Sequence, residues 1–595
     1  MQIENIQDVL ARHNGAEPLY ARPLGVLDPR RDPFHALLCQ PHGIIEANDT
    51  RIGNADSVAC VPMYAAMLRE AAERHCQLVV TPEYSTPWEV VEAIARGDYR
   101  PPHGSLWALG CESIAPAALE AYGASLTNLP DIRLIHEPIY AQERTHKRFI
   151  DPLVYVFWAR TDAGAEKLCL LVQFKTIPSR DDDNLELRHL YLGNTVYRFT
   201  NAAPAINLIG IICSDAFGAT SELTPDVFAD TLFLHIQLNK NPGNPVYAGY
   251  RSHLYTMASD RRVEVLCLNW ASRLGVVGAQ ETWNEISGSG WYVSPPGVLV
   301  NDADVNRLHR DGIYYSLVDK RWHAFYLNYS PHFIVIEKQR VYSTGHQVLA
   351  PRIAPHVIVR RNWSAARGAW EDSGADDGFA AFLEGYQPVT AQLSTLGASD
   401  PLAVERALEL LQGPSGQPST WWAVNELHAL KVADEESLRR ITVSQETNPQ
   451  RVGVAFRRNR VRAAVAAVRV IGQPLRWPPG AADLARGFEY RWNTADPHCN
   501  VEPLNGGGRP ATLVYLGEEP EEDVLSNIYD KLGKALRIQA AGRGEDAINQ
   551  DPIRATDRLC VVYRRNNALE SFSPARNHSI TNPGTNAEDD IARSA

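Results

Sequence analysis

Near-continuous apolar runs alternate with segments of helical periodicity through the first half of the chain. The runs at 77–84, 168–177 and 205–213 have the length and composition of buried strands, and residues 61–76 repeat apolar side chains at helical spacing. Strands that are apolar along their whole length are typical of sheets covered on both faces. The pattern therefore predicts an α/β domain, in which helices cover a mixed sheet.

The same patterns predict further elements. Thr86 is a residue type that caps helices and Pro87 suits a first helical turn, so we expect a helix from there to Gly97. The other expected helices lie at 115–122 and 249–261, and the other expected strands at 34–40, 131–137, 154–159, 167–174, 232–238, 263–269, 312–318, 323–327 and 333–337.

The second half of the chain differs in composition. Residues 351–419 are rich in Ala, Gly, Asp and Ser, with one helix expected between Ser399 and Gly413 and a linker at 413–419. Beyond them we expect helices at 435–441, 461–470 and 521–537 and strands at 511–516 and 558–563. The predicted organisation is an N-terminal extension (1–32), a main domain (33–350), a helical linker region (351–419), a smaller α/β or α+β C-terminal domain (420–570) and a flexible tail (571–595).

Charge and composition narrow the classes of function. The 595 residues include 58 Lys plus Arg and 70 Asp plus Glu, and the formal charge of -12 argues against nucleic-acid or membrane-surface binding. The arginines within 457–462 alternate with Val and Ala, as on a solvated helix face. No apolar window reaches the roughly 18 residues of a membrane span, and the first residues lack a signal-peptide pattern. Nine cysteines without a C-x-x-C pair indicate neither a zinc site nor a disulfide framework, so we expect a cytoplasmic protein.

Three ionisable side chains stand at the ends of apolar strands: Glu83, Lys175 and Cys213. Open α/β folds bind their ligands at this edge of the sheet. A cysteine thiol has an ordinary pKa of about 8.5, so it needs a nearby base or positive charge to react at neutral pH. Each residue also has a structural interpretation, namely a buried cysteine, a glutamate that caps the next helix and a lysine at a solvated edge. Their shared position at strand ends favours a catalytic set.

These residues lie in segments that resemble motifs of the nitrilase, or carbon-nitrogen hydrolase, superfamily. TPEYS (81–85), FKTIPS (174–179) and ICSDAF (212–217) resemble its glutamate, lysine and cysteine motifs, and 250–272 and 287–297 resemble two downstream segments. The resemblance covers about residues 33–345 and implies a nitrilase-like four-layer α-β-β-α sandwich, with the strands after residue 297 completing the second sheet. The separation of Glu83 from Lys175 exceeds the family pattern, which predicts an insertion between 98 and 150.

The resemblance also implies a mechanism without metal or organic cofactor. Cys213 would attack an amide or nitrile carbon to form a thioester, and Glu83 would transfer protons. Lys175 and the backbone N–H of Ser214 would stabilise the charge of the tetrahedral centre. The remaining site residues are expected to support the base, shape the nucleophile turn or contact the small-molecule substrate: Glu186, Asp215, Tyr84, Asn239, Tyr247 and His253.

Two other hypotheses stay open at this point. A nitrilase-like domain can serve as a sensor or assembly module with little or no hydrolysis, as in bacterial antiviral systems beside reverse transcriptases, although this chain has no Y-x-D-D motif. A Cys-His hydrolase would use His189, His235 or His253. The C-terminal half lacks a phosphate-binding G-x-x-x-x-G-K-[ST] loop and an S-G-G-x-D-S motif, which argues against a fused synthetase. Family members commonly pair through outer helices, which implies a homo-oligomer, and the C-terminal domain offers surface for a protein partner.

Overall fold

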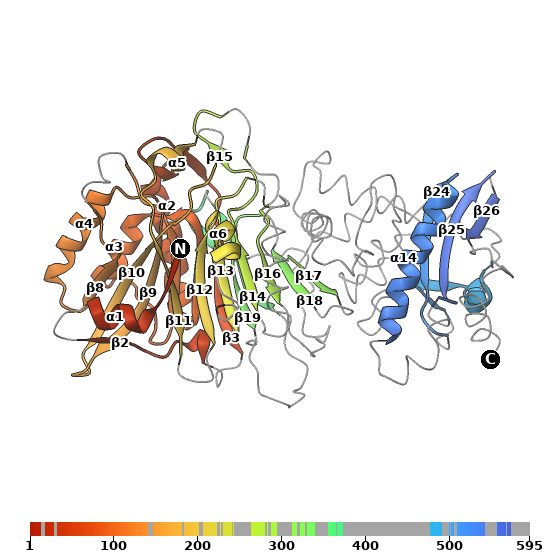
Figure 1. Cartoon of the computed structure of the whole chain (residues 1–595), viewed down its shortest axis with the longest axis horizontal. Coiled ribbons are helices and arrows are strands. Elements are labelled where there is room, and N and C mark those ends of the chain that lie inside the picture. Colours follow the sequence, from red (N-terminus) through yellow and green to blue (C-terminus); the bar gives the residue numbers. More distant parts are fainter. Residues whose placement is uncertain are drawn as a thin grey trace. The chain divides into compact units, whose positions relative to one another are not determined.

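The computed structural model describes residues 1–372 and 477–572, with gaps of which the longest are 243–262, 294–311, 339–354 and 542–555. The chain divides into two compact units, one formed by Met1–Asn306 with His323–Ala375 and the other by Arg307–Trp322 with Asp376–Ala595 (Figure 1). Several expectations lie outside the described residues: Tyr247, His253, the helices at 249–261, 435–441 and 461–470 and the one before Gly413, the linker at 413–419, the arginines within 457–462, and the tail from 573 onward.

The first unit is built on two large sheets. One sheet has the order β21-β20-β19-β3-β6-β7-β9-β10-β8, and β2 pairs with β9 at its side. Its strands are β2 (Leu19–Ala21), β3 (Phe34–Gln40), β6 (Leu78–Thr86), β7 (Leu106–Cys111), β8 (Ile132–His136), β9 (Pro152–Thr161), β10 (Glu166–Phe174), β19 (His332–Lys338), β20 (His356–Ser364) and β21 (Ala369–Asp372). Because β3, β6 and β7 are parallel, their carboxyl ends meet at one edge.

The other sheet runs in the order β1-β11-β12-β13-β14-β16-β18. Its strands are β1 (Gln2–Asn5), β11 (Thr195–Thr200), β12 (Asn207–Ile212), β13 (Thr231–Ile236), β14 (Glu264–Leu268), β16 (Gly290–Val293) and β18 (Trp322–Leu327). The central strands β12, β13 and β14 are parallel and buried. Short elements complete the unit: β4 (Ile44–Ala47), β5 (Ile52–Asn54), β15 (Gly275–Val276), α5 (Leu185–His189), η1 (Gly25–Leu27) and η2 (Leu126–Asn128).

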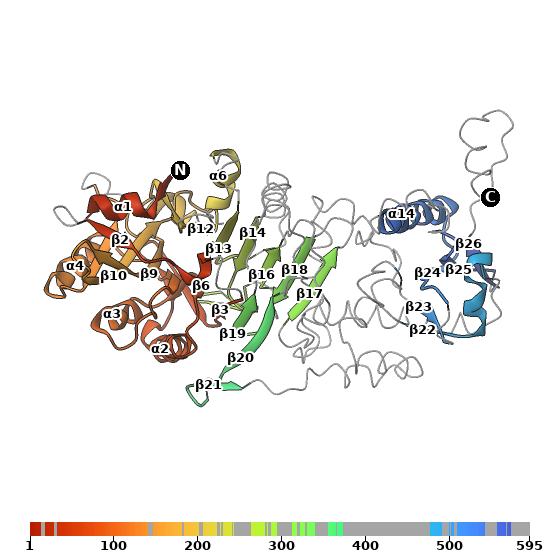
Figure 2. The ribbon, with the colours of Figure 1, turned by 90° about the horizontal axis from the view of Figure 1, so that it is seen from below.

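Helices cover the outer faces of these sheets, which pack against each other (Figure 2). Helices α2 (Ser57–Glu73), α3 (Trp88–Arg96) and α4 (Pro116–Ser125) share one apolar core with β3, β6, β7, β9 and β10. Helices α1 (Ile6–His13) and α6 (Asp215–Glu222) lie by the other sheet. Between the sheets, the ring of Phe199 packs on Tyr155 and Phe157, with centroids 4.9 and 5.5 Å apart. The nitrilase-like α-β-β-α sandwich implied by the sequence resemblance is therefore confirmed.

Several expected boundaries differ from the structure. Residues 1–32 are no extension, because β1 pairs with β11 and β2 pairs with β9. The sheet continues past residue 350, since β20 pairs with β19 and β21 pairs with β20. The strands after residue 297 do not all complete one sheet, because β18 pairs with β16 whereas β19 pairs with β3. Residues 98–150 supply β7, α4 and β8, of which β7 is an inner strand between β6 and β9.

The second unit contains the α/β elements expected near the end of the chain. Strand β24 (Thr512–Glu518) is parallel to β25 (Leu559–Arg565), α14 (Glu522–Ala541) connects them, and β26 (Ala568–Phe572) pairs antiparallel with β25. Arg558 binds the Asp483 carboxylate through two nitrogens, at 2.9 and 3.1 Å. The other elements in its range are β17 (Gly312–Leu317), η5 (Pro479–Arg486), β22 (Phe488–Tyr490) and β23 (Val501–Pro503). No helix of the described residues combines the length and apolar character that a membrane span requires.

Candidate active site

Glu83 projects from an irregularity within β6. The pairing of β6 with β7 is regular from Leu78 to Thr81, and the register then shifts before Thr86 pairs with Cys111. Gly110 of β7 permits the close approach at this point, because a Cβ there would lie 2.1 Å from the carbonyl oxygen of Pro82. A bulge turns a side chain out of its normal alternation, and here it directs Glu83 to the sheet edge.

Glu83 does not cap the following helix. Its Oε1 accepts a hydrogen bond from Lys175 Nζ at 2.7 Å, and its Oε2 accepts one from the backbone N–H of Leu238 at 2.5 Å. Helix α3 begins after Pro87 and has no side-chain cap. The prediction that Thr86 caps this helix is wrong, because the Thr86 hydroxyl lies 2.8 Å from the Thr81 hydroxyl and hydrogen-bonds with it inside the core.

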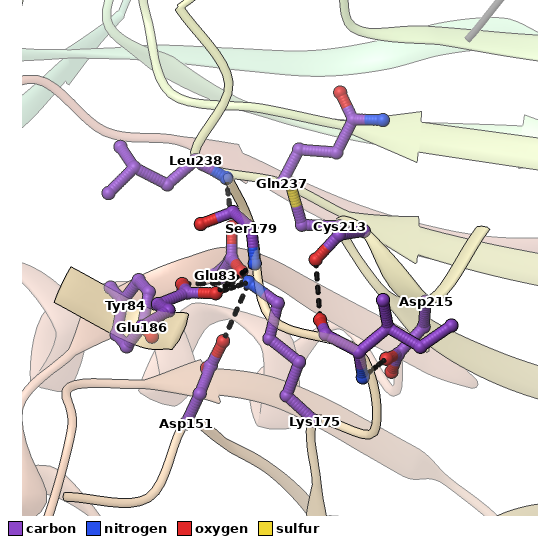
Figure 3. A network of polar contacts seen from close by, with 12 residues as sticks. Glu83, Tyr84, Asp151, Lys175, Ser179, Glu186, Cys213, Asp215, Gln237 and Leu238 are labelled. Carbon is purple, nitrogen blue, oxygen red and sulfur yellow. Dashed lines mark hydrogen bonds and ion pairs between the residues drawn. The ribbon is translucent and has the colours of Figure 1, made fainter. Parts of the chain in front are cut away.

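Lys175 follows β10 and is fully buried. Its ammonium contacts three carboxylates, 2.7 Å from Glu83, 2.8 Å from Glu186 and 3.4 Å from Asp151 (Figure 3). Oxygens of these carboxylates lie within 4.8 Å of one another, a spacing at which carboxylates can also hold a metal ion. The cation they contact here is Lys175 itself. The interpretation of Lys175 as a solvated edge residue is therefore excluded.

Glu186 is placed by the short helix α5, and each of its oxygens has a donor. Tyr84 donates its hydroxyl to Oε1 at 2.9 Å, and the backbone N–H of Ser179 donates to Oε2 at 2.6 Å. Burial opposes ionisation, but Lys175 and the hydrogen bonds from Ser179 outweigh it and lower the pKa of Glu186. Tyr84, expected to contact substrate, is itself buried against Glu186. Glu186 is thus the stable anion that holds Lys175.

Cys213 occupies the turn between β12 and α6 and has a φ of 40°, which is uncommon for a residue other than glycine. Its N–H donates to Ile236 O at 2.8 Å, continuing the pairing of β12 with β13. Its carbonyl accepts from His235 Nε2 at 2.9 Å. Such strained turns occur where a side chain must be presented at the end of a strand. His235 thus supports the backbone of the turn, and its ring also lies 3.0 Å from Gln237 Nε2 and 3.8 Å from Cys267 Sγ.

Two side chains join the turn at Cys213 to the segment that follows Lys175. Asp215 Oδ1 accepts hydrogen bonds from the backbone N–H groups of Thr176 and Ile177 and from the Thr176 hydroxyl, each at 2.8 Å. Ser214 donates its hydroxyl to Ile177 O at 2.6 Å. These bonds fix the position of Lys175 relative to Cys213. Burial raises the pKa of Asp215 to about 7, although Lys175 and the three donors act in the opposite direction.

The charges of the cluster are strongly coupled. Burial opposes the charge of Lys175, but Glu186, Glu83 and Asp151, followed by Cys213, outweigh it and raise its pKa well above the usual value. Burial raises the pKa of Glu83, and Glu186 adds to this while Lys175 opposes it. Lys175 therefore stays an ammonium ion. The pKa of Glu83 lies above its ordinary value, which is the direction that a general base working near neutral pH requires.

A second set of buried hydrogen bonds holds the loop above Glu83. The Asn269 amide accepts from the Asn239 N–H at 3.0 Å and donates to the Asn239 carbonyl at 2.9 Å. Trp270 donates its indole N–H to Glu83 O at 2.8 Å. The Asn239 side chain in turn donates to Gln237 Oε1 at 3.4 Å. These contacts position Leu238, whose N–H bonds Glu83. The expectation that Asn239 binds substrate stays a prediction.

The structure brings Glu83, Lys175 and Glu186 together and places Cys213 and Asp215 beside them (Figure 3). Ser214 lies between these two residues in the same turn and bonds Ile177 O. The structure also adds Asp151, which the sequence reasoning missed. The only signal was its position before a strand that forms a hairpin with the lysine strand. His189 lies at the end of α5, where its carbonyl accepts from Arg148 and Phe149.

Fold and cluster together define a nitrilase-like α-β-β-α protein with a buried Glu-Lys-Glu arrangement next to a cysteine turn. No family model and no curated protein matches the chain. Among solved structures, it is similar to the amidase of Nesterenkonia AN1 from the nitrilase superfamily (12% identity, 43% of this chain and 82% of that chain, TM-score 0.25). It is similar to Saccharomyces cerevisiae Nit3, with 12% identity over 45% of this chain and 84% of that chain and a TM-score of 0.24. It is also similar to the glutamine-dependent NAD+ synthetase of Acinetobacter baumannii, with 11% identity over 89% of this chain and 74% of that chain and a TM-score of 0.27. At these identities, the chemistry of the chain has to be argued from its own cluster.

Proposed function

We propose that this protein is a cysteine-dependent hydrolase of a non-peptide C–N bond, with an amide as substrate in preference to a nitrile. Glu83, Lys175 and Cys213 form its catalytic set, and the reaction passes through a thioester on Cys213. The observation that carries the proposal is the buried ammonium of Lys175, fixed 2.7 Å from Glu83 in a cluster tied to the cysteine turn through Asp215.

In the acylation step, Glu83 takes the thiol proton of Cys213 as the sulfur attacks the carbonyl carbon. The tetrahedral oxyanion forms near the Lys175 ammonium and the Ser214 N–H, which stabilise it. The C–N bond then breaks as Glu83 returns the proton to the departing nitrogen, and the acyl group stays on the sulfur as a thioester.

Deacylation uses the same groups. Glu83, ionised again, takes a proton from a water molecule that attacks the thioester carbon. The C–S bond breaks, and the thiolate of Cys213 recovers the proton from Glu83 when the acid leaves. Lys175 keeps its proton throughout, as expected from the direction of its pKa. Glu186 keeps its charge and holds Lys175 in place.

Ammonia release from a panel of small aliphatic and aromatic amides, with the matching nitriles alongside, tests the proposal. The wild type should hydrolyse some of the amides, whereas Cys213→Ala and Glu83→Gln should lose about 10²-fold or more, as for removal of a nucleophile or a general base. Cys60→Ala is the matched control, because Cys60 is only partly buried and bonds Asn54 Oδ1 at 3.4 Å, outside the cluster. It should keep full activity.

Alkylation with iodoacetamide at pH 7 provides a readout that needs no substrate. Burial raises the pKa of Cys60 to about 11 and those of Cys76 and Cys169 to about 12, so these thiols should react slowly. Cys213 should react faster, and Glu83→Gln should remove that advantage. An inert Cys213 together with no amide turnover would contradict the proposal and favour a sensor or assembly role.

A further inference from the structure

Asp151 is a carboxylic acid in the cluster to which the proposed mechanism assigns no step. It immediately precedes β9, and its side chain is fully buried. Its backbone carbonyl accepts from the Lys175 N–H at 3.1 Å, and its Oδ2 lies 3.4 Å from Lys175 Nζ. Neither carboxyl oxygen has a donor aligned for a hydrogen bond among the described residues. A buried carboxylate in such a position is unfavourable if it is ionised.

The neighbouring carboxylates, Glu83 and Glu186, differ from Asp151 in that their oxygens accept hydrogen bonds. Both oxygens of Glu83 accept hydrogen bonds, from Lys175 and Leu238, and both oxygens of Glu186 do as well. Three buried carboxylates surround the Lys175 ammonium ion, so full ionisation would leave excess negative charge in a buried space. A proton on one carboxyl relieves this excess. The group without aligned donors is the one that loses least by holding it.

We propose that Asp151 is neutral in the resting site and acts as a positioning residue that keeps Glu83 ionised and ready to serve as the base. This role rests on the proposed function of Glu83. A neutral Asp151 adds no negative charge beside Glu83, and its O–H can donate toward the Glu83 carboxylate. An ionised Asp151 would repel the Glu83 carboxylate, favour its protonation and compete for the Lys175 ammonium.

The charged and titratable groups around Asp151 agree with this assignment. They come from β6, from the end of β7, from the end of β10 and from α5: Glu83, Tyr84, Cys111, Lys175 and Glu186. Burial raises the pKa of Asp151 well above its usual value, Glu83 and Glu186 add to the effect, and Lys175 opposes it.

Unfolding of the full chain in urea between pH 5 and 9 tests the proposal, read by pulsed hydrogen exchange on peptides from β9 and β10. The variants are Asp151→Asn and Asp151→Ser, which are neutral at every pH, and the control is Asp483→Asn, whose carboxylate pairs with Arg558 in the second unit. Because a neutral folded-state Asp151 has a raised pKa, wild type should lose stability relative to both Asp151 variants as pH rises. The ratio of unfolding constants should change by up to about tenfold per pH unit below the folded pKa.

The opposite slope would overturn the proposal. If Asp151 is ionised in the folded protein with a lowered pKa, both neutral variants should lose stability relative to wild type as pH rises through the ordinary aspartate range, which is seen when the measurement is extended below pH 5. Parallel curves would also overturn it, since a group with the same pKa in both states contributes no slope. Asp483→Asn should leave the exchange of the β9 and β10 peptides unchanged.

The rate of Cys213 alkylation at pH 7 separates this proposal from the proposed function. Asp151→Asn should keep the rate within about threefold of wild type, because a neutral amide replaces a neutral acid of similar shape. A loss of about 10²-fold or more would show that Asp151 has to be an anion and would overturn the proposal. If Glu83→Gln alkylates as fast as wild type, the proposed function fails, whereas the unfolding curves still decide the proton on Asp151.

Discussion

The ion pair between Lys175 and Glu186 is the structural centre of the site, and its coupling can be measured. Lys175→Met removes the ammonium from a fully buried position and leaves Glu83 and Glu186 without the cation that they share. Breaking a buried pair on one side costs about 3–5 kcal/mol, because the remaining charge is uncompensated. Lys175→Met should therefore lower the free energy of unfolding by this amount at pH 7, and by less at pH 5, where the carboxylates take up protons more readily.

A double-mutant cycle with Glu186→Gln isolates the pair. Glu186→Gln alone should cost about 1–3 kcal/mol, because Lys175 keeps its contact with Glu83 while the Tyr84 and Ser179 donors lose a charged acceptor. Combined with Lys175→Met, it removes the anion that the first change left unpaired. The double variant should then be at least about 1 kcal/mol more stable than the sum of the single changes predicts. Urea unfolding of the four proteins measures this, and additivity within about 0.5 kcal/mol would refute the pairing described here.

Three further predictions concern residues around the cluster. Asp215→Asn should remove a pH dependence of stability, because burial raises the pKa of Asp215 to about 7 in the folded protein. In urea unfolding, wild type should lose up to about 4 kcal/mol relative to the variant between pH 4 and pH 7. Parallel curves for the two proteins would contradict this. Gly110→Ala should displace the bulge at Glu83, because the Cβ of the alanine would meet the Pro82 carbonyl. We expect Cys213 to be alkylated slowly in the folded variant. A wild-type rate of alkylation would show that Cys213 reactivity does not depend on the bulge. Tyr84→Phe should cost about 1–2 kcal/mol of unfolding free energy by removing a donor to Glu186, and no loss would mean that the bond is not made in solution.

The sequence pattern was informative wherever local composition decides the structure. The run FHALLCQ is apolar throughout most of its length and forms β3 with the expected bounds, and LCLLVQF lies within β10. The elements near residue 520 were also expected, because acidic residues open α14 and apolar runs form β24 and β25.

The sequence pattern failed where a partner strand decides the structure. β1 has the polar sequence QIEN, and β20 contains two arginines after its apolar residues, so neither resembles a buried strand. Both form because an edge strand of a large sheet offers unpaired backbone groups. The irregularity at Glu83 likewise depends on Gly110, which lies on the neighbouring strand β7 and not in the local sequence of β6.

The candidate site divides in the same way. Glu83, Lys175 and Cys213 were identifiable because each stands near a strand end in a segment that resembles a family motif. Asp151 was not, because it reaches the site through the pairing of β9 with β10, in which Pro152 lies opposite Phe174. The bonds between Asn269 and the backbone of Asn239 were not predictable either, because the two residues lie 30 positions apart and no local pattern pairs them.

Trapping of the acyl-enzyme tests the central claim most directly. The protein is mixed with an amide that it hydrolyses, quenched in acid within the first turnover and analysed by peptide mass spectrometry. The account predicts an acyl group on the Cys213 peptide, which hydroxylamine removes, and no such adduct in Cys213→Ala or Glu83→Gln. Turnover without any acyl group on Cys213, or with the acyl group on another residue, would contradict it.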